Sequence, residues 1–451
     1  MASINRRQFM GRAAGVAAAF TVVPRRVLGG PGHKPPSETL NIAGIGVGGQ
    51  GAGDLRNVES ENIVALCDVD WKHAAKTFER YPNARRYRDF RVMLEKEKNI
   101  DAVVVATPDH VHAVAAMAAI KMGKHVYVEK PLTYSVHEAR ALTEEARKAG
   151  VATQMGNQGH AAEAMRLLKE WIEDGAIGTV RKVETWTPHA VWPQGIDRPT
   201  QTPPVPDTLS WDLWLGPAPE RPYHPAYLPA MWRGWWDFGT GAMGDMGCHI
   251  LDMAFYAFEL TWPTSVEASF STFVPEGLSW DKKFNTESYP RASIVRFRFP
   301  ARGDRPPLKV TWYDGGLMPE RPDELEKDRR MGNMFGGLLF IGETGKIICG
   351  AHGADGLRII PESKMQAYER PPKRLPRSIG HHAEWIAACK GGPKPGSNFD
   401  YAGPLTETVL LGNIAIRAQR RIEWDPTKME IANVPEANQW LRREYRDGWA
   451  L

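Results

Sequence analysis

Residues 40–51 read Leu40-Asn41-Ile42-Ala43-Gly44-Ile45-Gly46-Val47-Gly48-Gly49-Gln50-Gly51, an apolar strand pattern that runs directly into a glycine-rich turn. Gly46, Gly48 and Gly51 fit the G-x-G-x-x-G fingerprint of a dinucleotide-binding loop. In that loop the first glycine permits the tight turn, the second lets the backbone approach a pyrophosphate, and the third lets the next helix pack on the strand. Gly44, Gly46 and Gly49 have the same spacing, but that register would begin inside the strand, so we prefer the first.

A second strand pattern, Ile63-Val64-Ala65-Leu66-Cys67, ends at Asp68, which lies 22 residues after Gly46 (68 − 46). A carboxylate at this point can accept hydrogen bonds from the adenosine ribose hydroxyls. It also repels a 2′-phosphate, which favours NAD over NADP. The order of strand, glycine turn, helix, strand and acid is much more specific than the glycine spacing alone.

The alternation of strand and helix continues beyond Asp68. Strand patterns at 101–106, 124–128 and 151–155 are separated by helix patterns at 111–121 and 135–149. This order predicts a doubly wound parallel sheet, a Rossmann domain, in which ligands bind at the carboxyl ends of the strands. The polar or turn-forming residues that follow strands 101–106 and 124–128 are therefore expected at the cofactor: Thr107, Pro108, His110, Glu129 and Lys130.

The pattern changes after Gly156. A helix is expected at about 161–174, and strands with alternating polarity at 180–186, 264–273, 292–299 and 308–313, with a hairpin at 340–347. We therefore predict a C-terminal α+β domain with a large, mostly antiparallel sheet and helices on one face. The predicted domains are a leader and linker at 1–37, the Rossmann domain at 38–157 and a substrate domain at 158–451. The large sheet could also join subunits of a homo-oligomer.

The segment 186–236 is rich in proline and holds seven of the 16 tryptophans. Aromatic faces stack well on the C–H surfaces of sugars, but tryptophans also pack long irregular loops. We expect most of the seven to be structural and one or two, Trp192 among them, to line a substrate site together with Arg233, Asn157 and Gln158.

Asp245 and His249 follow a run of glycines and lie four residues apart in a stretch that looks helical from about 245. This spacing places both side chains on one helix face, where a carboxylate can orient an imidazole and raise its basicity. A surface ion pair, or a capping aspartate beside a structural histidine, gives the same spacing. A metal site is not predicted, because no third ligand follows at a recognisable spacing.

The first 23 residues have the layout of an export signal. Arg6 and Arg7 precede an apolar run at 13–23, which is too short to span a bilayer. Paired arginines before an Ala/Gly-rich stretch resemble a twin-arginine signal and predict a periplasmic protein without stable membrane insertion. Residues 24–37 look like a linker.

The composition favours a soluble enzyme over a nucleic-acid-binding protein. The formal net charge of +4 owes much to the arginines of the leader, and no basic stripe suggests a nucleic-acid partner. Cys67, Cys248, Cys349 and Cys389 are widely spaced and are predicted to be free thiols.

Taken together, the motifs resemble the Gfo/Idh/MocA family, named after glucose–fructose oxidoreductase, inositol dehydrogenase and MocA. The resemblance covers residues 40–260 motif by motif. The matching pieces are the glycine loop, Cys67-Asp68-Val69-Asp70, Ala106-Thr107-Pro108-Asp109-His110, Glu129-Lys130-Pro131-Leu132, Asp174 to Gly178, and Gly241 to His249.

The family implies that Lys130 contacts both substrate and nicotinamide, that Asp245 and His249 match its D-x-x-x-H pair, and that the histidine is the proton acceptor. The expected reaction is hydride transfer between a sugar or polyol hydroxyl and NAD, with a cofactor that stays bound and is recycled. Asn157 and Gln158 stand where relatives often carry an arginine, which leaves the sugar open.

Two alternatives remain. The first is a redox-neutral glycosidase, lyase or epimerase that oxidises the sugar transiently to a keto-sugar. The second is a non-catalytic NAD-binding sensor, against which the joint presence of Lys130, Asp245 and His249 argues.

Overall fold

The computed structural model describes residues 38–272 and 284–451. The first half forms a six-stranded parallel sheet in the order β3-β2-β1-β4-β5-β6, which is the strand order of a Rossmann domain. The predicted doubly wound sheet is therefore confirmed. Its strands are β1 (Asn41–Ile45), β2 (Asn62–Cys67), β3 (Arg85–Tyr87), β4 (Ala102–Val105), β5 (His125–Val128) and β6 (Thr153–Met155), and its helices are α3 (Gly49–Asn57), α4 (Ala75–Arg80), α5 (Phe90–Lys96), α6 (Asp109–Lys121) and α7 (Val136–Ala149).

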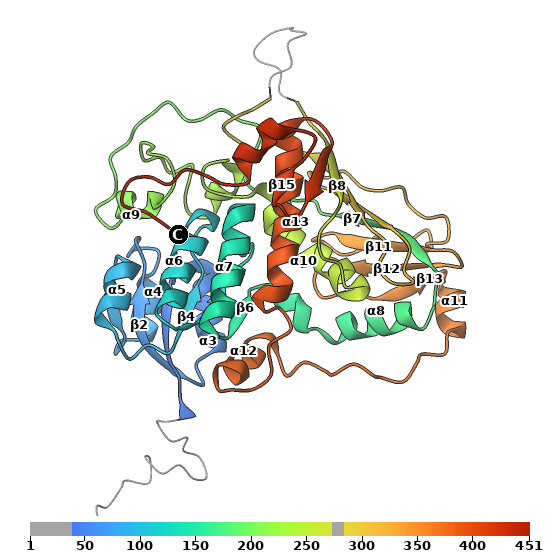
Figure 1. Ribbon diagram of the computed structural model, residues 1–451, viewed down its shortest axis with the longest axis horizontal. Helices are drawn as coiled ribbons and strands as arrows, with labels where there is room; N and C mark the ends of the chain where they lie inside the picture. The colour runs from blue at the N-terminus through green and yellow to red at the C-terminus, as the bar shows by residue number, and fades with distance from the viewer. Residues whose placement is uncertain (1–37, 273–283) are drawn as a thin grey trace, which may run out of the picture.

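Both faces of this sheet are covered, which explains why its central strands β1, β4 and β5 are mostly apolar and buried. Helices α5, α6 and α7 pack on one face. Helices α3 and α4 pack on the other, together with α12 (His381–Cys389), whose Trp385 is fully buried there. A helix from late in the chain thus completes the N-terminal domain (Figure 1). The predicted Rossmann domain, 38–157, does not include α12, because no sequence motif marks this helix.

The glycine turn between β1 and α3 has the geometry that its spacing predicts. Gly46 has a φ of +76°, and a Cβ there would lie 2.7 Å from the carbonyl oxygen of Ala106. A Cβ on Gly51 would lie 2.0 Å from the carbonyl oxygen of Gly46, so only glycine lets α3 pack this closely on the strand turn. Helix α3 begins at Gly49, directly after the turn.

The second domain is built on a nine-stranded sheet in the order β13-β12-β11-β7-β10-β9-β8-β14-β15, and only the β7/β10 pair is parallel. The mostly antiparallel sheet and the 340–347 hairpin are confirmed. The strands are β7 (Val180–Trp186), β8 (Ser265–Phe270), β9 (Ser293–Phe299), β10 (Leu308–Tyr313), β11 (Gly337–Gly342), β12 (Lys346–Gly350), β13 (Arg358–Ile360), β14 (Ile422–Asp425) and β15 (Glu430–Ile431).

One face of this sheet packs on α8 (Glu163–Glu173), α10 (Gly241–Phe258) and α13 (Phe399–Ala418), which share one apolar core with it. The remaining helical segments are η3 (Gln158–Ala161), α9 (Trp211–Leu215), η4 (Met231–Gly234), α11 (Glu362–Ala367) and η5 (Pro435–Trp440). Figure 1 shows α10 and α13 between the two sheets, so the element that carries Asp245 and His249 lies where the domains meet.

Helix α10 begins at Gly241, four residues before the start expected from the glycine run. The glycines belong to its first turns because neighbouring groups come too close for a side chain. A Cβ on Gly244 would lie 1.9 Å from the hydroxyl oxygen of Thr240, and one on Gly247 would lie 2.7 Å from Val409 of α13. Tertiary packing thus overrides the weak helix propensity of glycine.

The tryptophan-rich segment packs largely on itself. Trp214, Trp232 and Trp235 are buried in one apolar cluster, and the ring of Trp211 stacks on that of Trp214 at 4.7 Å between centroids. This agrees with the expectation that most of the seven tryptophans are structural.

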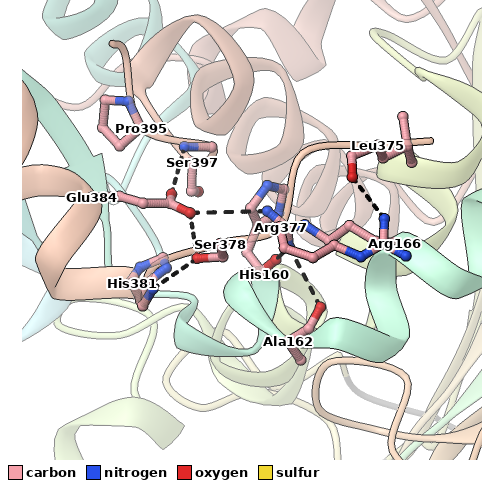
Figure 2. Close-up of polar contacts among 12 residues, drawn as sticks. His160, Ala162, Arg166, Leu375, Arg377, Ser378, His381, Glu384, Pro395 and Ser397 are labelled. Carbon is pink, nitrogen blue, oxygen red and sulfur yellow. Dashed lines mark hydrogen bonds and ion pairs between the residues drawn. The ribbon is translucent and has the colours of Figure 1, made fainter. Parts of the chain in front are cut away.

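A polar network joins α12 to the second domain (Figure 2). Glu384 of α12 accepts hydrogen bonds from Ser378 and from the backbone N–H of Gly396, and it lies 4.0 Å from Arg166 of α8. Arg377 forms a bidentate ion pair with the buried Glu170 of α8. These contacts hold the 375–397 segment in place, so the chain that returns to the Rossmann sheet is firmly attached at both ends.

The predicted export signal and linker at 1–37 lie outside the described residues. No helix among the residues that the structure describes is long and apolar enough to cross a bilayer. All four cysteines are free, as predicted, and three of them are buried.

Candidate active site

A cavity of about 600 Å³ is lined by residues of both domains. At one end lie the glycine turn and the end of β2, and at the other lie Lys130 and His249. One continuous space therefore connects the predicted nucleotide site to the predicted chemistry.

The nucleotide end is shaped for a pyrophosphate and a ribose. Gly46, Gly48 and Gly49 line it, and the N-terminus of α3 opens into it. Backbone N–H groups at such a terminus favour anions. Asp68 also lines this end; its carboxylate accepts hydrogen bonds from the backbone N–H groups of Val47 and Gly48 at 2.8 and 3.2 Å. These residues fit an NAD molecule, with Gly51 supporting the turn from behind.

Replacing Asp68 by alanine is expected to weaken NAD binding about 10- to 100-fold, because a charge-assisted hydrogen bond is lost. The affinity for NADP should change much less, since the carboxylate no longer repels a 2′-phosphate. Calorimetric titration of both cofactors checks this. Equal affinity of the native protein for NAD and NADP would contradict the assignment of Asp68.

The turn after β4 brings Thr107 and Pro108 to the cavity wall, as predicted, but not His110. His110 is fully buried, and its two ring nitrogens lie 3.1 and 2.9 Å from the carbonyl oxygens of Phe238 and Trp214. Its assignment to the cofactor is wrong because it occupies the inward face of α6. His112, two residues later, reaches the wall instead.

Lys130 lies directly after β5, and its peptide bond to Pro131 is cis. Its Nζ donates a hydrogen bond of 2.6 Å to Oδ1 of Asp245. The same oxygen accepts a hydrogen bond of 2.8 Å from Nε of Arg233. Burial alone would raise the pKa of the Asp245 carboxyl, but the charges of Lys130 and Arg233 outweigh burial and hold that pKa well below its usual range. Asp245 is thus a permanent anion that positions two cations.

His249 shares the cavity face of α10 with Asp245, yet the two are not hydrogen-bonded in the described structure. Nδ1 of His249 is buried and has no hydrogen-bond partner among the described residues. The expectation that Asp245 orients His249 directly is therefore wrong, because the Asp245 carboxylate accepts its hydrogen bonds from Lys130 and Arg233 instead. Burial and the nearby charge of Lys130 lower the pKa of His249 well below its usual value, so the ring is neutral and able to accept a proton.

The remaining predicted substrate residues divide between the cavity and its surroundings. Arg233 and Gln158 line the cavity, whereas Asn157 and Trp192 do not. Asn157 is fully buried and accepts a hydrogen bond from Ser397, because it faces the returning chain. Trp192 lies just outside the cavity lining, next to Arg233. The distance from the guanidinium carbon of Arg233 to the ring centroid of Trp192 is 5.7 Å. Trp214 and Trp232 are the tryptophans of the 186–236 segment on the wall.

Sequence reasoning missed three residues at the substrate end: His189, Phe335 and His352. The ring of His352 lies 4.7 Å from that of His249, centroid to centroid, and Phe335 packs edge-on against His352. These residues come from loops after β7, before β11 and after β12, and no motif marks them. Their position next to strand ends was the one available signal.

Burial shifts two further carboxyl groups near Lys130 toward their uncharged forms. Burial raises the pKa of Glu129 well above its usual value, with a further contribution from the charge of Asp54. Burial likewise raises the pKa of Asp109, to about 7. Within 38–272 and 284–451, no group of three or more His, Cys, Asp or Glu side chains is arranged to hold a metal ion.

Two family models match the chain. The Gfo/Idh/MocA model described as an oxidoreductase family with an NAD-binding Rossmann fold matches residues 40–157. The model for the C-terminal alpha/beta domain of that oxidoreductase family matches residues 164–285. Together the two matches cover just over half of the chain.

Individual relatives are more distant. The chain is 28% identical to a levoglucosan dehydrogenase of Pseudarthrobacter phenanthrenivorans over 211 residues, which are 47% of this chain and 46% of that protein. It is 29% identical to a myo-inositol 2-dehydrogenase of Thermotoga maritima over 31% of this chain and 42% of that protein. The matches thus span less than half the length of these relatives. A solved levoglucosan dehydrogenase in complex with NADH shares the fold at a TM-score of 0.56 and 19% identity, covering 85% of this chain and 99% of that one.

Proposed function

The chain belongs to the Gfo/Idh/MocA oxidoreductase family and has its NAD-binding Rossmann domain, and from this we propose that it transfers hydride between NAD and a hydroxyl-bearing carbon of a sugar or polyol. The observation that carries the proposal is the single cavity that joins Gly46, Gly48 and Asp68 at one end to Lys130 and His249 at the other. A nucleotide bound along it extends toward the lysine and the imidazole. The dehydrogenase relatives support the substrate class.

Bound NAD supplies a nicotinamide ring that accepts or returns the hydride. The chain's own residues handle the proton and the oxygen. His249 accepts the proton of the sugar hydroxyl at the ring nitrogen that faces the cavity. Lys130, held by Asp245, donates a hydrogen bond to the reacting oxygen and stabilises the charge that develops on it. Glu129 and Gln158 hold the turn behind Lys130, since Gln158 donates a hydrogen bond of 2.6 Å to Glu129.

A turnover assay with mixed sugars and aryl glycosides tests this proposal. Absorbance of reduced cofactor and release of the aglycone are followed in the same sample. Reduction of NAD without aglycone release supports the dehydrogenase, and aglycone release without net reduction supports the redox-neutral alternative. If neither signal appears although the sugars bind, the protein is a sensor and the proposal fails.

A specific observation favours the redox-neutral reaction as the second candidate. The substrate end holds three imidazoles, those of His189, His249 and His352. Burial is the largest cause that lowers the pKa of each, so all three are neutral proton acceptors. Elimination from a keto-sugar needs a second proton-transfer group besides the one that deprotonates the hydroxyl, and His189 or His352 would supply it.

We further propose that the protein is exported through the twin-arginine route and carries its cofactor with it. A folded cargo can retain a bound nucleotide, whereas the periplasm offers no nicotinamide pool for exchange. The hydride must then return to a second substrate, or to the first, at the same site. The arginine pair Arg6-Arg7 and the apolar run that follows support this proposal.

Protein recovered from the periplasm is therefore expected to retain nicotinamide through gel filtration and to turn over without added NAD. Nucleotide content after denaturation, together with activity before and after adding NAD, checks both points. If the periplasmic protein contains no nicotinamide and is active only with added NAD, the proposal of a recycled cofactor is wrong. The protein would then be an ordinary dehydrogenase that exchanges its cofactor.

We also propose that copies of the chain associate through the large sheet. The face of β8, β9 and β10 opposite α13 carries mostly polar side chains, among them Glu267, Arg296 and Lys309. Sedimentation of the full chain tests this: a dimer or tetramer that Arg296→Glu dissociates supports it, and a native monomer contradicts it.

A further inference from the structure

Arg233 is fixed in one orientation at the substrate end of the cavity. Its guanidinium carbon lies 4.2 Å from the ring centroid of Trp232, and its Nε is tied to Asp245. The backbone of Arg233 is equally constrained, because its Cα lies 2.4 Å from the position that a Cβ on Gly239 would take. An arginine held by stacking and by one charged partner is pre-organised to bind a ligand with its remaining edge.

The remaining edge of the Arg233 guanidinium has N–H donors available for a ligand. Nη1 of Arg233 makes one long contact of 3.4 Å, to the carbonyl oxygen of Ala230, and Nη2 makes no hydrogen bond with the described residues. Lys130 spends one of its three N–H groups on Asp245. The side chain of Arg233 is 24% exposed, toward the cavity that it lines.

The charges at this end do not cancel. Lys130 and Arg233 carry two positive charges, and the carboxylate of Asp245 pairs with both of them. Burial keeps Glu129 and, below about pH 7, Asp109 in their uncharged forms. It also keeps the rings of His189, His249 and His352 neutral. Below about pH 7 the site therefore has an excess of one positive charge, and burying an unbalanced charge is costly.

We infer that the substrate carries an anionic oxygen group, specifically the carboxylate of a sugar acid, and that the free edge of Arg233 binds it. A guanidinium edge matches the two oxygens of a carboxylate with two parallel hydrogen bonds. A monoanion also balances the single excess charge, which a phosphate dianion would exceed. The inference rests on the proposed function, because it names the class of sugar that the same cavity accepts.

Binding to the full-length protein loaded with NADH tests the inference without requiring turnover. The probes are D-glucuronate, D-galacturonate and D-mannuronate, each paired with its methyl ester, which has nearly the same shape but no charge. D-glucose 6-phosphate and D-glucose complete the set. Calorimetry should give an affinity about 10- to 100-fold higher for at least one acid than for its ester, as expected for a charge-assisted hydrogen-bond pair.

Variants then assign the preference to Arg233. In Arg233→Met the ratio of acid to ester affinity should fall close to one, whereas Arg233→Lys, which keeps the charge but not the planar edge, should retain part of it. Arg88→Met is the matched control. Arg88 is a cation of the same cavity, but it lies at the nucleotide end, where its guanidinium carbon is 4.7 Å from the ring centroid of Trp71. Arg88→Met should leave the ratio of acid to ester affinity unchanged, even if it changes the affinity for the cofactor.

Esters that bind as tightly as their acids in all three pairs would overturn the inference, as would D-glucose bound while no acid binds. A glucose 6-phosphate affinity above that of every acid would overturn the choice of carboxylate. An acid preference that survives in Arg233→Met would overturn the role of Arg233. None of these outcomes touches the proposed hydride transfer, which fails separately if no sugar of any charge exchanges hydride with the cofactor.

Discussion

Lys130→Met is expected to lower kcat by about 10²- to 10⁴-fold while the affinity for NAD stays within a few-fold of the native value. The ammonium group of Lys130 is the donor that reaches the reacting oxygen, and nothing else at the end of β5 replaces it. Methionine keeps the length of the side chain, and Arg233 still pairs with Asp245 at 2.8 Å, so the buried carboxylate is not left alone. Steady-state kinetics and NAD titration of the same preparation measure the two effects.

Lys124→Met is the matched control for this change. Lys124 precedes β5 at the opposite end of the same strand, and among the described residues its Nζ donates one hydrogen bond, of 3.3 Å, to the backbone carbonyl of Lys98. This variant should retain native kinetics. Near-native turnover of Lys130→Met would remove Lys130 from the mechanism, and a parallel loss of NAD binding would show that its role is to hold the nucleotide.

His249→Gln and His249→Phe are both expected to lose about 10²- to 10⁴-fold in kcat, because neither side chain can accept the proton. Glutamine keeps an N–H donor, so the pair separates a proton acceptor from a mere hydrogen-bond donor. If His249 only donates to the substrate, the glutamine variant should keep most of the activity. His137→Gln, a partly exposed position on α7, serves as the control.

The pH profile of the native protein gives a second test of His249. Burial and the charge of Lys130 oppose its protonation, so the folded-state pKa lies well below 6.5. Activity that depends on the neutral ring should be constant through the ordinary titration range of histidine and fall only in more acidic solution. An acid limb centred near pH 6.5 that disappears in His249→Gln would contradict the depressed pKa.

The Rossmann half could be predicted in detail because its signals are local. Gly46 and Gly51 are required by backbone clashes within the turn itself, and Asp68 follows from the position of β2. The long alternation of β1 to β6 leaves little choice of topology. What could not be predicted is the return of α12 to this sheet, since Trp385 is buried in a core cluster whose other members, such as Val47, lie far earlier in the chain.

The site could be predicted only in part, and the wrong predictions share one cause. Lys130, Asp245 and His249 meet as the motifs indicate, and Arg233 lies beside them, but the pairing among them differs from the one that i, i+4 spacing suggests. Helical spacing states which side chains share a face, not which partner on another element reaches the carboxylate first. His110 and Asn157 were misplaced because adjacency to a motif says nothing about whether a side chain faces the cavity or the core.

In the proposed reaction, hydride passes directly between a sugar carbon and the bound cofactor. The most direct measurement is a single turnover of the NAD-loaded protein with sugars and sugar acids deuterated at carbon, followed by mass spectrometry of the nicotinamide cofactor. Direct transfer places one deuterium on the cofactor within the first turnover of the native protein, and none in Lys130→Met on the same time scale. Deuterium that appears only in water, or a cofactor that stays unlabelled while the sugar is transformed, would contradict it.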